Sequence, residues 1–468
     1  MSSGQRFLVA ALLACLTSSS ASAGGLFLPS RGVRASGRAG AFVAGADDPS
    51  ALWYNPAGLG EYARTHGERR ELLVDAAFIG HDVTYTRIDS GGKARDPVEN
   101  EGQLLPIPTV GAGFTLAPRL ALGVGIFAPY AALDGYPEKG PQRYSLITLH
   151  NSMIVIGEVA LAYKVNDLIT LGAGLQNLFF SFNSRIVFSG CPAELVCAPE
   201  DPEFDSLGEI RQLDLLNPSG VLGVQLRPLR GLRLGMALQL PFRSSSEGTV
   251  SVRLPVSGYF KGAHVEGERA DIRMTFPLML RLGVEFSPSR RFRAETGVDF
   301  EKWSQHDEIV IEPKDMRIED VAVVGIYEIG PLRIPRKFED TLAVRLGIEA
   351  EPLAGKPFVL RGGYVWETSA VPDEYLSVML VDGQKHVLTA GMSYRFNRLR
   401  VDGVVGYVLV GKREVPRATS CAPMLNPIRT GETQEECTHD EDPANVHVGD
   451  GTYVSSYKLV GLGVALDF

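Results

Sequence analysis

The stretch Leu399-Arg-Val-Asp-Gly-Val-Val-Gly-Tyr-Val-Leu-Val410 decides the fold, because apolar residues alternate along it with glycine or polar residues. The same two-residue period recurs in 292–300 (FRAETGVDF) and in 341–350 (TLAVRLGIEA). Such alternation predicts a β-strand with one apolar face and one small or polar face. We therefore expect an all-β chain.

Fourteen segments with this pattern follow the N-terminal region. They lie near 70–89, 107–117, 120–129, 144–164, 168–189, 210–227, 232–252, 268–287, 291–312, 340–351, 358–369, 385–396, 399–415 and 452–468. The connections between them alternate strictly between long and short. The short ones are 117–119, 165–167, 228–231, 287–290, 352–357 and 397–398, and the long ones are 90–106, 130–143, 190–209, 253–267, 313–339, 370–384 and 416–451.

This alternation of loop length favours a transmembrane barrel over a large secreted β-sandwich. Outer-membrane barrels have short periplasmic turns, long outward loops and an even number of antiparallel strands, whereas a sandwich has no reason to sort its loops. Closure also removes the edges that so many strands would expose. The predicted fold is a 14-stranded antiparallel transmembrane β-barrel over residues 67–468, and its terminal Phe468 is typical of substrates of the barrel assembly machinery.

Composition excludes several other classes of protein. The 468 residues carry 46 Lys+Arg against 55 Asp+Glu, a net charge of -9, which argues against a nucleic-acid partner. Only residues 7–16 form an apolar run, and this run is too short for a spanning helix.

The apolar run at 7–16 has Arg6 before it and Ala21-Ser22-Ala23 after it, and this pattern predicts a signal peptide over 1–23. A lipoprotein signal ending at Cys15 is the alternative.

Four cysteines remain after residue 23 and form two local pairs, Cys191 with Cys197 and Cys421 with Cys437. In a secreted chain, local disulfides in two outward loops are the simplest interpretation. A metal site is the alternative, but there is no Cys-x-x-Cys spacing and the histidines are scattered. We expect no metal and no cofactor.

Residues 24–66 are rich in glycine and turns and do not resemble a strand. A barrel of fourteen strands is wider than side chains alone fill, so an internal plug is physically reasonable. Within this segment, Ala41-Phe-Val-Ala-Gly-Ala-Asp-Asp-Pro-Ser-Ala-Leu-Trp-Tyr-Asn55-Pro56-Ala57-Gly58 resembles the N-terminal hatch of the long-chain fatty acid transporter (FadL/TodX) family. Further similarity lies at 125–130, 303–305, 371–380 and 391–396.

The resemblance implies an outer-membrane channel for passive uptake of hydrophobic compounds, either long-chain fatty acids or aromatic hydrocarbons. It also implies lateral release through a gap at a kinked third strand, here near Pro129 and Tyr130. Proline has no N–H for the ladder, so Pro129 should interrupt pairing there, although it could equally just end the strand. The amide of Asn55, in a turn held by Pro56 and Ala57, is then expected to satisfy the neighbouring backbone. Expected partners are the ligand, membrane lipid with lipopolysaccharide, and the assembly machinery.

A pocket for fatty acids needs apolar walls and a cation for the carboxylate. Phe179, Phe180, Phe182 and Phe188 flank Arg185 near the outer end of the fifth strand, and they are the candidate wall and head-group cation. Lys337 is a second candidate cation. The alternative is an aromatic girdle facing lipid with an arginine in the lumen.

Enzyme signatures are poor. Gly-x-Gly pairs at 111–113, 172–174 and 461–463 lie inside strands, and there is no Gly-x-Ser-x-Gly elbow. We expect a channel and not an enzyme. A barrel that binds ligands or surfaces without transport, such as an adhesin, stays open as an alternative.

Overall fold

The computed structural model describes residues 30–64, 67–102, 104–130, 134–149, 152–192, 196–198, 200–353, 355–428, 437 and 446–468. The expected signal peptide (1–23) lies outside these residues. No helix in the described ranges is long and apolar enough to cross a bilayer.

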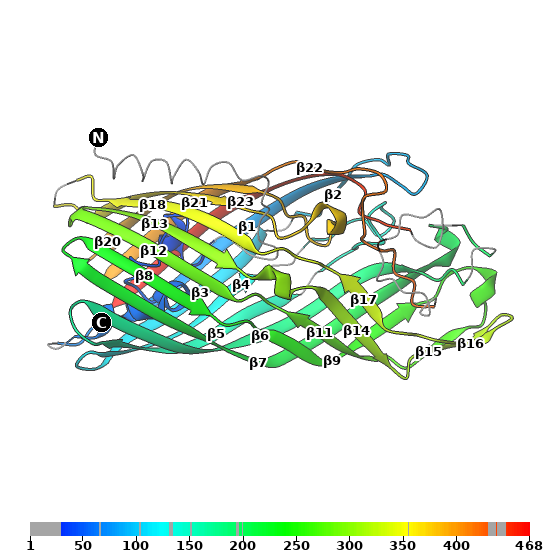
Figure 1. Ribbon diagram of the computed structural model, residues 1–468, viewed down its shortest axis with the longest axis horizontal. Coiled ribbons are helices and arrows are strands. Elements are labelled where there is room, and N and C mark those ends of the chain that lie inside the picture. The colour runs from blue at the N-terminus through cyan, green and yellow to red at the C-terminus, as the bar shows by residue number, and fades with distance from the viewer. Residues whose placement is uncertain are drawn as a thin grey trace, which may run out of the picture.

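The chain forms a closed barrel of fourteen antiparallel strands. Closure is made by the first and last strands, which pair without a shift from Glu71↔Asp467 to Arg87↔Gly451. Figure 1 shows the strands tilted around the long axis, with the short N-terminal helices inside one end. The predicted all-β fold class is therefore confirmed.

Several wall strands run uninterrupted. They are β1 (Arg70–Arg87), β3 (Leu104–Ala117), β4 (Leu120–Tyr130), β5 (Met153–Lys164), β6 (Ile169–Ser189), β7 (Asp205–Leu229), β19 (Phe358–Glu367), β20 (Lys385–Phe396) and β23 (Gly451–Asp467). The others are each divided in two: β8 (Leu232–Gln239) with β9 (Arg243–Arg253), β12 (Met279–Ser289) with β11 (Arg269–Thr275), β13 (Phe292–Glu301) with β14 (Glu308–Lys314), β18 (Thr341–Ala350) with β17 (Leu332–Pro335), and β21 (Leu399–Val410) with β22 (Arg413–Val415).

Remaining elements lie among the loops or inside the barrel. Loop elements are β2 (Val98–Glu99), a small sheet of β10 (His264–Glu266), β15 (Arg317–Val321) and β16 (Gly325–Glu328), and the 3-10 turns η2 (Pro202–Phe204), η3 (Gly258–Phe260), η4 (Trp303–Gln305) and η5 (Asp373–Tyr375). The internal elements are α2 (Val33–Ser36), α3 (Ala51–Tyr54) and η1 (Pro56–Tyr62).

The strand positions follow the predicted segments, with one clear difference at the fourth. We expected a strand over 144–164, but β5 begins only at Met153. Residues 144–149 instead belong to a loop that packs beside β6, where Thr148 forms a bridge with Arg185. Pro241 divides β8 from β9, because its missing N–H cannot continue the ladder.

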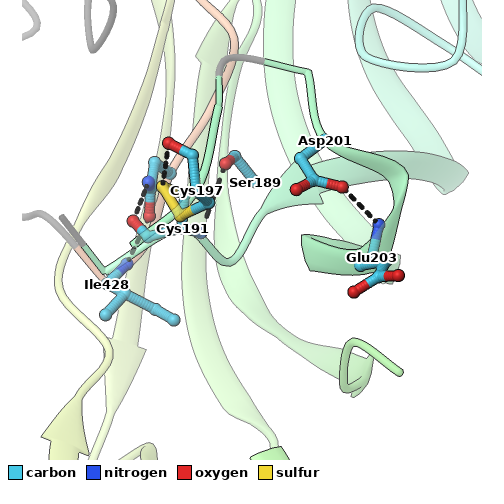
Figure 2. The surroundings of a disulfide bond; sticks show 7 residues. Ser189, Cys191, Cys197, Asp201, Glu203 and Ile428 are labelled. Atoms are coloured by element: carbon cyan, nitrogen blue, oxygen red, sulfur yellow. Dashed lines mark hydrogen bonds between the residues drawn. A yellow bond between two sulfur atoms is a disulfide. The ribbon is translucent and has the colours of Figure 1, made fainter. Parts of the chain in front are cut away.

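Both predicted disulfides, Cys191–Cys197 and Cys421–Cys437, are present. They lie in the long loops after β6 and β22. Figure 2 shows the first disulfide beside Ile428, which belongs to the last long loop. The two loops are joined by hydrogen bonds from Asn426 Nδ2 to the Cys191 carbonyl (2.9 Å) and from Ser189 N to the Leu425 carbonyl (2.8 Å). The described parts of these two loops are therefore connected at this end of the barrel.

The N-terminal segment (residues 30–64) lies inside the wall with almost every residue buried. Its turn at Asn55-Pro56 fits against two wall glycines. A Cβ added at Gly172 on β6 would overlap the backbone of Pro56 and Ala57, and one added at Gly223 on β7 would overlap Asn55 Oδ1. Glycine is needed at these positions because another backbone approaches closely.

We therefore expect Gly172→Ala to destabilise the folded barrel relative to Gly220→Ala. At Gly220 on β7 the nearest atom to an added Cβ is 3.4 Å away, an ordinary contact. Both changes restrict the unfolded chain equally, so the difference reports the lost fit, about 1–3 kcal/mol for an overpacked site. The measurement is thermal unfolding in detergent, followed by circular dichroism. Equal midpoints for the two variants would contradict the proposed fit.

Candidate functional site

The upper lumen, between the long loops and the N-terminal segment, is filled with apolar side chains. One continuous cluster joins Leu52 and Trp53 of the segment, wall residues such as Phe127 and Phe180, and loop residues such as Met379. Phe180 packs against Phe276 on its edge, with ring centroids 5.8 Å apart. Porin interiors are polar, so this interior suits a hydrophobic ligand better than water or ions.

A small cavity opens in this cluster where the loops meet the wall. Its volume is about 30 Å³, which is room for about one or two waters. It is lined by Tyr144, Ser145, Ile186, Ile334, Pro335, Arg336, Tyr375, Ser377, Met379, Ala422, Pro423, Leu425 and Val448. Four loop segments and two wall strands contribute to it, so a ligand larger than water needs the loops to move.

Arg336 is the one cation among these lining residues. It is 4% exposed and forms no ion pair with the described residues. Its backbone N–H donates to the Asp307 carbonyl (2.7 Å), while its side-chain Nε has no partner. Arg336 lies in the connection before β18. The ten residues of β18 are by themselves long enough to cross the hydrocarbon, so Arg336 lies outside the membrane-spanning part of this strand. Burial lowers the pKa of Arg336 to about 10, so it stays a cation at neutral pH.

A cluster of aromatic rings lies beside the guanidinium of Arg336. Its guanidinium lies 5.5 Å from the ring centre of Phe338, which packs against Trp303 and His306. His306 Nδ1 donates to the Thr275 carbonyl (2.7 Å), and its Nε2 is buried without a partner. Burial, with Arg336 nearby, lowers the pKa of His306 to about 3. Because the His306 ring is neutral, it does not balance the positive charge of Arg336. Buried cations normally have an anionic partner, and Arg336 has none among the described residues.

The structure separates the residues that the sequence grouped into one pocket. Phe180, Phe182 and Phe188 face inward, and Phe180 and Phe182 stack with ring centroids 6.1 Å apart. Phe179 faces outward and is 37% exposed. Phe188 is fully buried but, like Phe180 and Phe182, does not line the Arg336 cavity.

Neither predicted cation lies in the cavity. Arg185 pairs with Glu138 (3.4 Å), a loop carboxylate also bonded by Arg253. The hydrogen bond from Arg253 and the charge of Arg185 hold the pKa of Glu138 below its usual value. Lys337 is half exposed and pairs with Asp307 (3.1 Å). Arg185 and Lys337, predicted as head-group cations, therefore each already have a carboxylate partner within the protein. Arg336 was missed, although its apolar neighbours Ile334, Pro335 and Phe338 hinted at burial.

The third wall strand, β4, is irregular at the predicted place. Its ladder with β5 shifts register between Phe127 and Tyr130, and its ladder with β3 ends at Thr109↔Phe127. Pro129 lies within this bulge. Its carbonyl accepts a hydrogen bond from Arg31 Nη2 of the N-terminal segment. The guanidinium carbon of Arg31 also lies 5.3 Å from the ring centre of Trp53.

Asn55 serves a different strand from the one expected. Its Nδ2 donates to the carbonyls of Val43 and of Val224 on β7 (both 3.0 Å), and its Oδ1 accepts from Ala57 N (3.1 Å). The amide therefore stabilises the Asn55-Pro56 turn against β7. The prediction that Asn55 satisfies the third strand is wrong, because Arg31 makes that contact.

The other end of the lumen is closed by charges, which we call the charged clamp. It consists of Arg34, Arg38, Asp47 and Asp48 from the segment with Glu71, Glu285, Arg293, Glu295, Glu349 and Arg400 from the wall. Arg38 lies 3.1 Å from both Glu285 and Glu295, and Asp47 lies 2.7 Å from Arg293. Although burial opposes it, the charges of Arg293 and Arg34 hold the pKa of Asp47 well below its usual value.

Two polar cavities lie at the mouth with the short turns, and the smaller of them is lined partly by clamp residues such as Arg34 and Asp47. One of about 540 Å³ is bordered by Arg64 and Arg119, and one of about 270 Å³ by Arg233 and Arg395. No group of three or more metal-binding side chains occurs in the described part of the chain. The described part of the lumen is thus mainly apolar above the segment, with a few buried charges, and ionic below it.

Comparisons with known proteins agree with this architecture. The family model of the outer membrane protein transport proteins (OMPP1/FadL/TodX) matches residues 14–434. The fold is similar to a FadL homologue of Pseudomonas aeruginosa (TM-score 0.76, 16% identity, 95% of this chain and 100% of that chain). It is also similar to the toluene transporter TodX of Pseudomonas putida (0.61, 14%, 94% and 98%) and to the toluene transporter TbuX of Ralstonia pickettii (0.58, 15%, 93% and 98%).

No curated protein matches the chain in sequence. The family match nevertheless extends over most of the chain and is independent of these structural likenesses, which by themselves concern only the fold. Transport proteins of the outer membrane, and not enzymes, make up this family. An apolar upper lumen, an internal N-terminal segment and an interrupted third strand are the features expected of such a channel. The chain belongs to the OMPP1/FadL/TodX family of outer-membrane transport proteins for hydrophobic compounds.

Proposed function

We propose that the chain takes up long-chain fatty acids, binds their carboxylate at Arg336, and releases them sideways at the third strand. Arg336 carries the choice of substrate. A buried guanidinium without an anionic partner is costly, and a ligand carboxylate in the same apolar cavity would supply that partner. An aromatic hydrocarbon has no group that could pair with it.

The charged clamp supports a sideways route. A hydrophobic ligand moving straight through the lumen would have to separate buried ion pairs such as Arg38 with Glu285 and Glu295. Breaking a buried pair costs about 3–5 kcal/mol, and an apolar tail offers nothing in return. The interrupted ladder beside Pro129 is the alternative path, at the border of the apolar region. In this view residues 24–66 act as the hatch and residues 67–468 as the channel.

A matched pair of neighbouring cations tests the substrate. We expect Arg336→Met to weaken binding of oleate to the purified protein about tenfold or more, since hydrogen bonds to charged groups contribute about 1.5–3 kcal/mol. Lys337→Met should leave binding unchanged, because Lys337 is exposed and pairs with Asp307. The measurement is titration calorimetry in detergent.

Methyl oleate, which has no charge, is the control ligand. It should bind the wild type and the Arg336→Met variant equally. Equal losses for oleate and its methyl ester would contradict head-group pairing. Tight binding of toluene by both proteins, with no oleate binding, would favour aromatic hydrocarbons instead.

Binding of oleate should depend on pH in a predictable way. A fatty acid carboxyl titrates near about pH 4–5, so pairing is lost as the ligand becomes protonated below that range. The Arg336 pKa of about 10 sets the other limit, because the guanidinium loses its charge as the pH rises through it. Affinity should therefore be flat from about pH 6 to 9 and fall on both sides. An affinity independent of pH between 4 and 11 would contradict the pairing.

Lateral release gives a prediction for Arg31. We expect Arg31→Met to lower oleate uptake by cells while leaving oleate binding unchanged. The Pro129 carbonyl loses its donor, and an unsatisfied buried acceptor costs about 1–3 kcal/mol, so the bulge of β4 should relax. Arg64→Met, at the exposed end of the segment, is the control at equal surface level. Unchanged uptake in Arg31→Met would show that this contact does not matter for release.

A further inference from the structure

The first five residues of β3 pair on one side only. They continue the ladder with β1 without a shift, from Ala76↔Pro108 to Gly80↔Leu104. On the other side the ladder with β4 stops at Thr109↔Phe127, and no described residue continues it. Residues 104–108 therefore form one rim of the interruption, and the end of β4 around Pro129 forms the opposite rim.

Two prolines occupy this rim, at positions 106 and 108. Their backbone direction follows from a neighbouring hydrogen bond, in which Thr115 N donates to the Arg69 carbonyl on the β1 side. Amides in a strand point alternately to the two sides, and the ladder has no shift from Phe114 to Leu104. Odd-numbered amides of β3 thus face β1, and even-numbered positions face β4. Pro106 and Pro108 lack an N–H at two of the three positions (104, 106 and 108) that would face the interruption, the two nearest the end of the ladder with β4.

The side chains make the same rim apolar. Leu104, Pro106 and Pro108 are exposed on the outer face, where lipid lies. Ile107 points inward and is buried in a cluster with Ile79 and Val33, against which Ala128 of β4 packs. A ligand passing between the rims would meet carbon atoms and carbonyls, without free amide donors at 106 and 108.

We propose that Pro106 and Pro108 are positioning residues that keep β3 from pairing with the end of β4. An unpaired N–H in hydrocarbon strongly favours pairing, so ordinary residues here would extend the ladder toward Ala128 and Tyr130. Proline removes the donors at 106 and 108 from one rim, and Arg31 satisfies the Pro129 carbonyl on the other. The inference rests on the proposed lateral release, for which it names the residues that hold the exit open.

The test is the double variant Pro106→Ala with Pro108→Ala in the full chain. Two measurements are made: oleate uptake by cells at equal surface level, and hydrogen exchange of the new amides in the purified protein. We expect protected amides at 106 and 108 and an uptake rate lowered about tenfold, a change that corresponds to 1.4 kcal/mol, about one net backbone hydrogen bond. Oleate binding should stay within about twofold of wild type.

Pro218→Ala is the matched control. Pro218 is exposed on β7 opposite Asn177, away from the interruption, so its replacement should leave uptake unchanged. Freely exchanging amides at 106 and 108 would overturn the proposal, because no new pairing forms. Protected amides with normal uptake would overturn it as well, because the closed rim then does not limit passage.

Failure of the proposed function gives a different result. If the wild type neither binds nor takes up oleate, the proposal that the protein transports fatty acids fails. The exchange measurement still decides the structural part in that case. Protected amides in the double variant would support the role of the two prolines at the rim, and exchanging amides would overturn it.

Discussion

The rest of the structure depends on one constraint: in hydrocarbon, each backbone N–H and C=O must find a partner within the protein. Closure of β1 on β23 meets this constraint for the whole wall, through an unshifted ladder of paired residues. Because pairing is otherwise so complete, the interruption of the ladder between β3 and β4 marks a special place in the wall. The ladder between β3 and β4 ends early, and there the donors are removed by prolines or the acceptor is satisfied by Arg31. Backbone groups are thus removed or satisfied at the place where the ladder between β3 and β4 is interrupted.

The N-terminal segment divides the lumen into two regions of different polarity. Above it, the aromatic and aliphatic cluster provides a mainly apolar environment with a few buried charges. Among them are Arg336 and Arg281, whose guanidinium lies 4.6 Å from the ring centre of Trp53. Below it, the charged clamp joins the segment to strands on several sides of the wall. A lipid-like ligand is soluble in the first region and excluded from the second. In the proposed function, the same segment would form the lower boundary of the binding region and a barrier to straight passage.

Much of this fold could be predicted from local patterns in the sequence. Strand alternation and loop lengths depend on neighbouring residues, and so does the pairing of Cys191 with Cys197 and of Cys421 with Cys437. The site could not be predicted in the same way. Arg336 and Lys337 are adjacent and chemically alike, and only the folding of distant loops buries one and exposes the other. Likewise, Asn55 and Arg31 both carry side-chain N–H donors, and the register of the segment in the lumen decides which of them reaches Pro129.

The charged clamp also has a consequence for how the barrel assembles. Strands β1 and β23 are separated by almost the whole chain, and contacts between such distant residues form slowly. Tyr62 of the segment donates to Glu71 on β1, and the clamp connects the segment to Arg293 and Glu295 in the middle of the chain and to Arg400 on β21. An element synthesised early thus carries binding positions for early, middle and late strands. The N-terminal segment would then serve as an internal template, to which the strands bind before β1 and β23 pair and close the barrel.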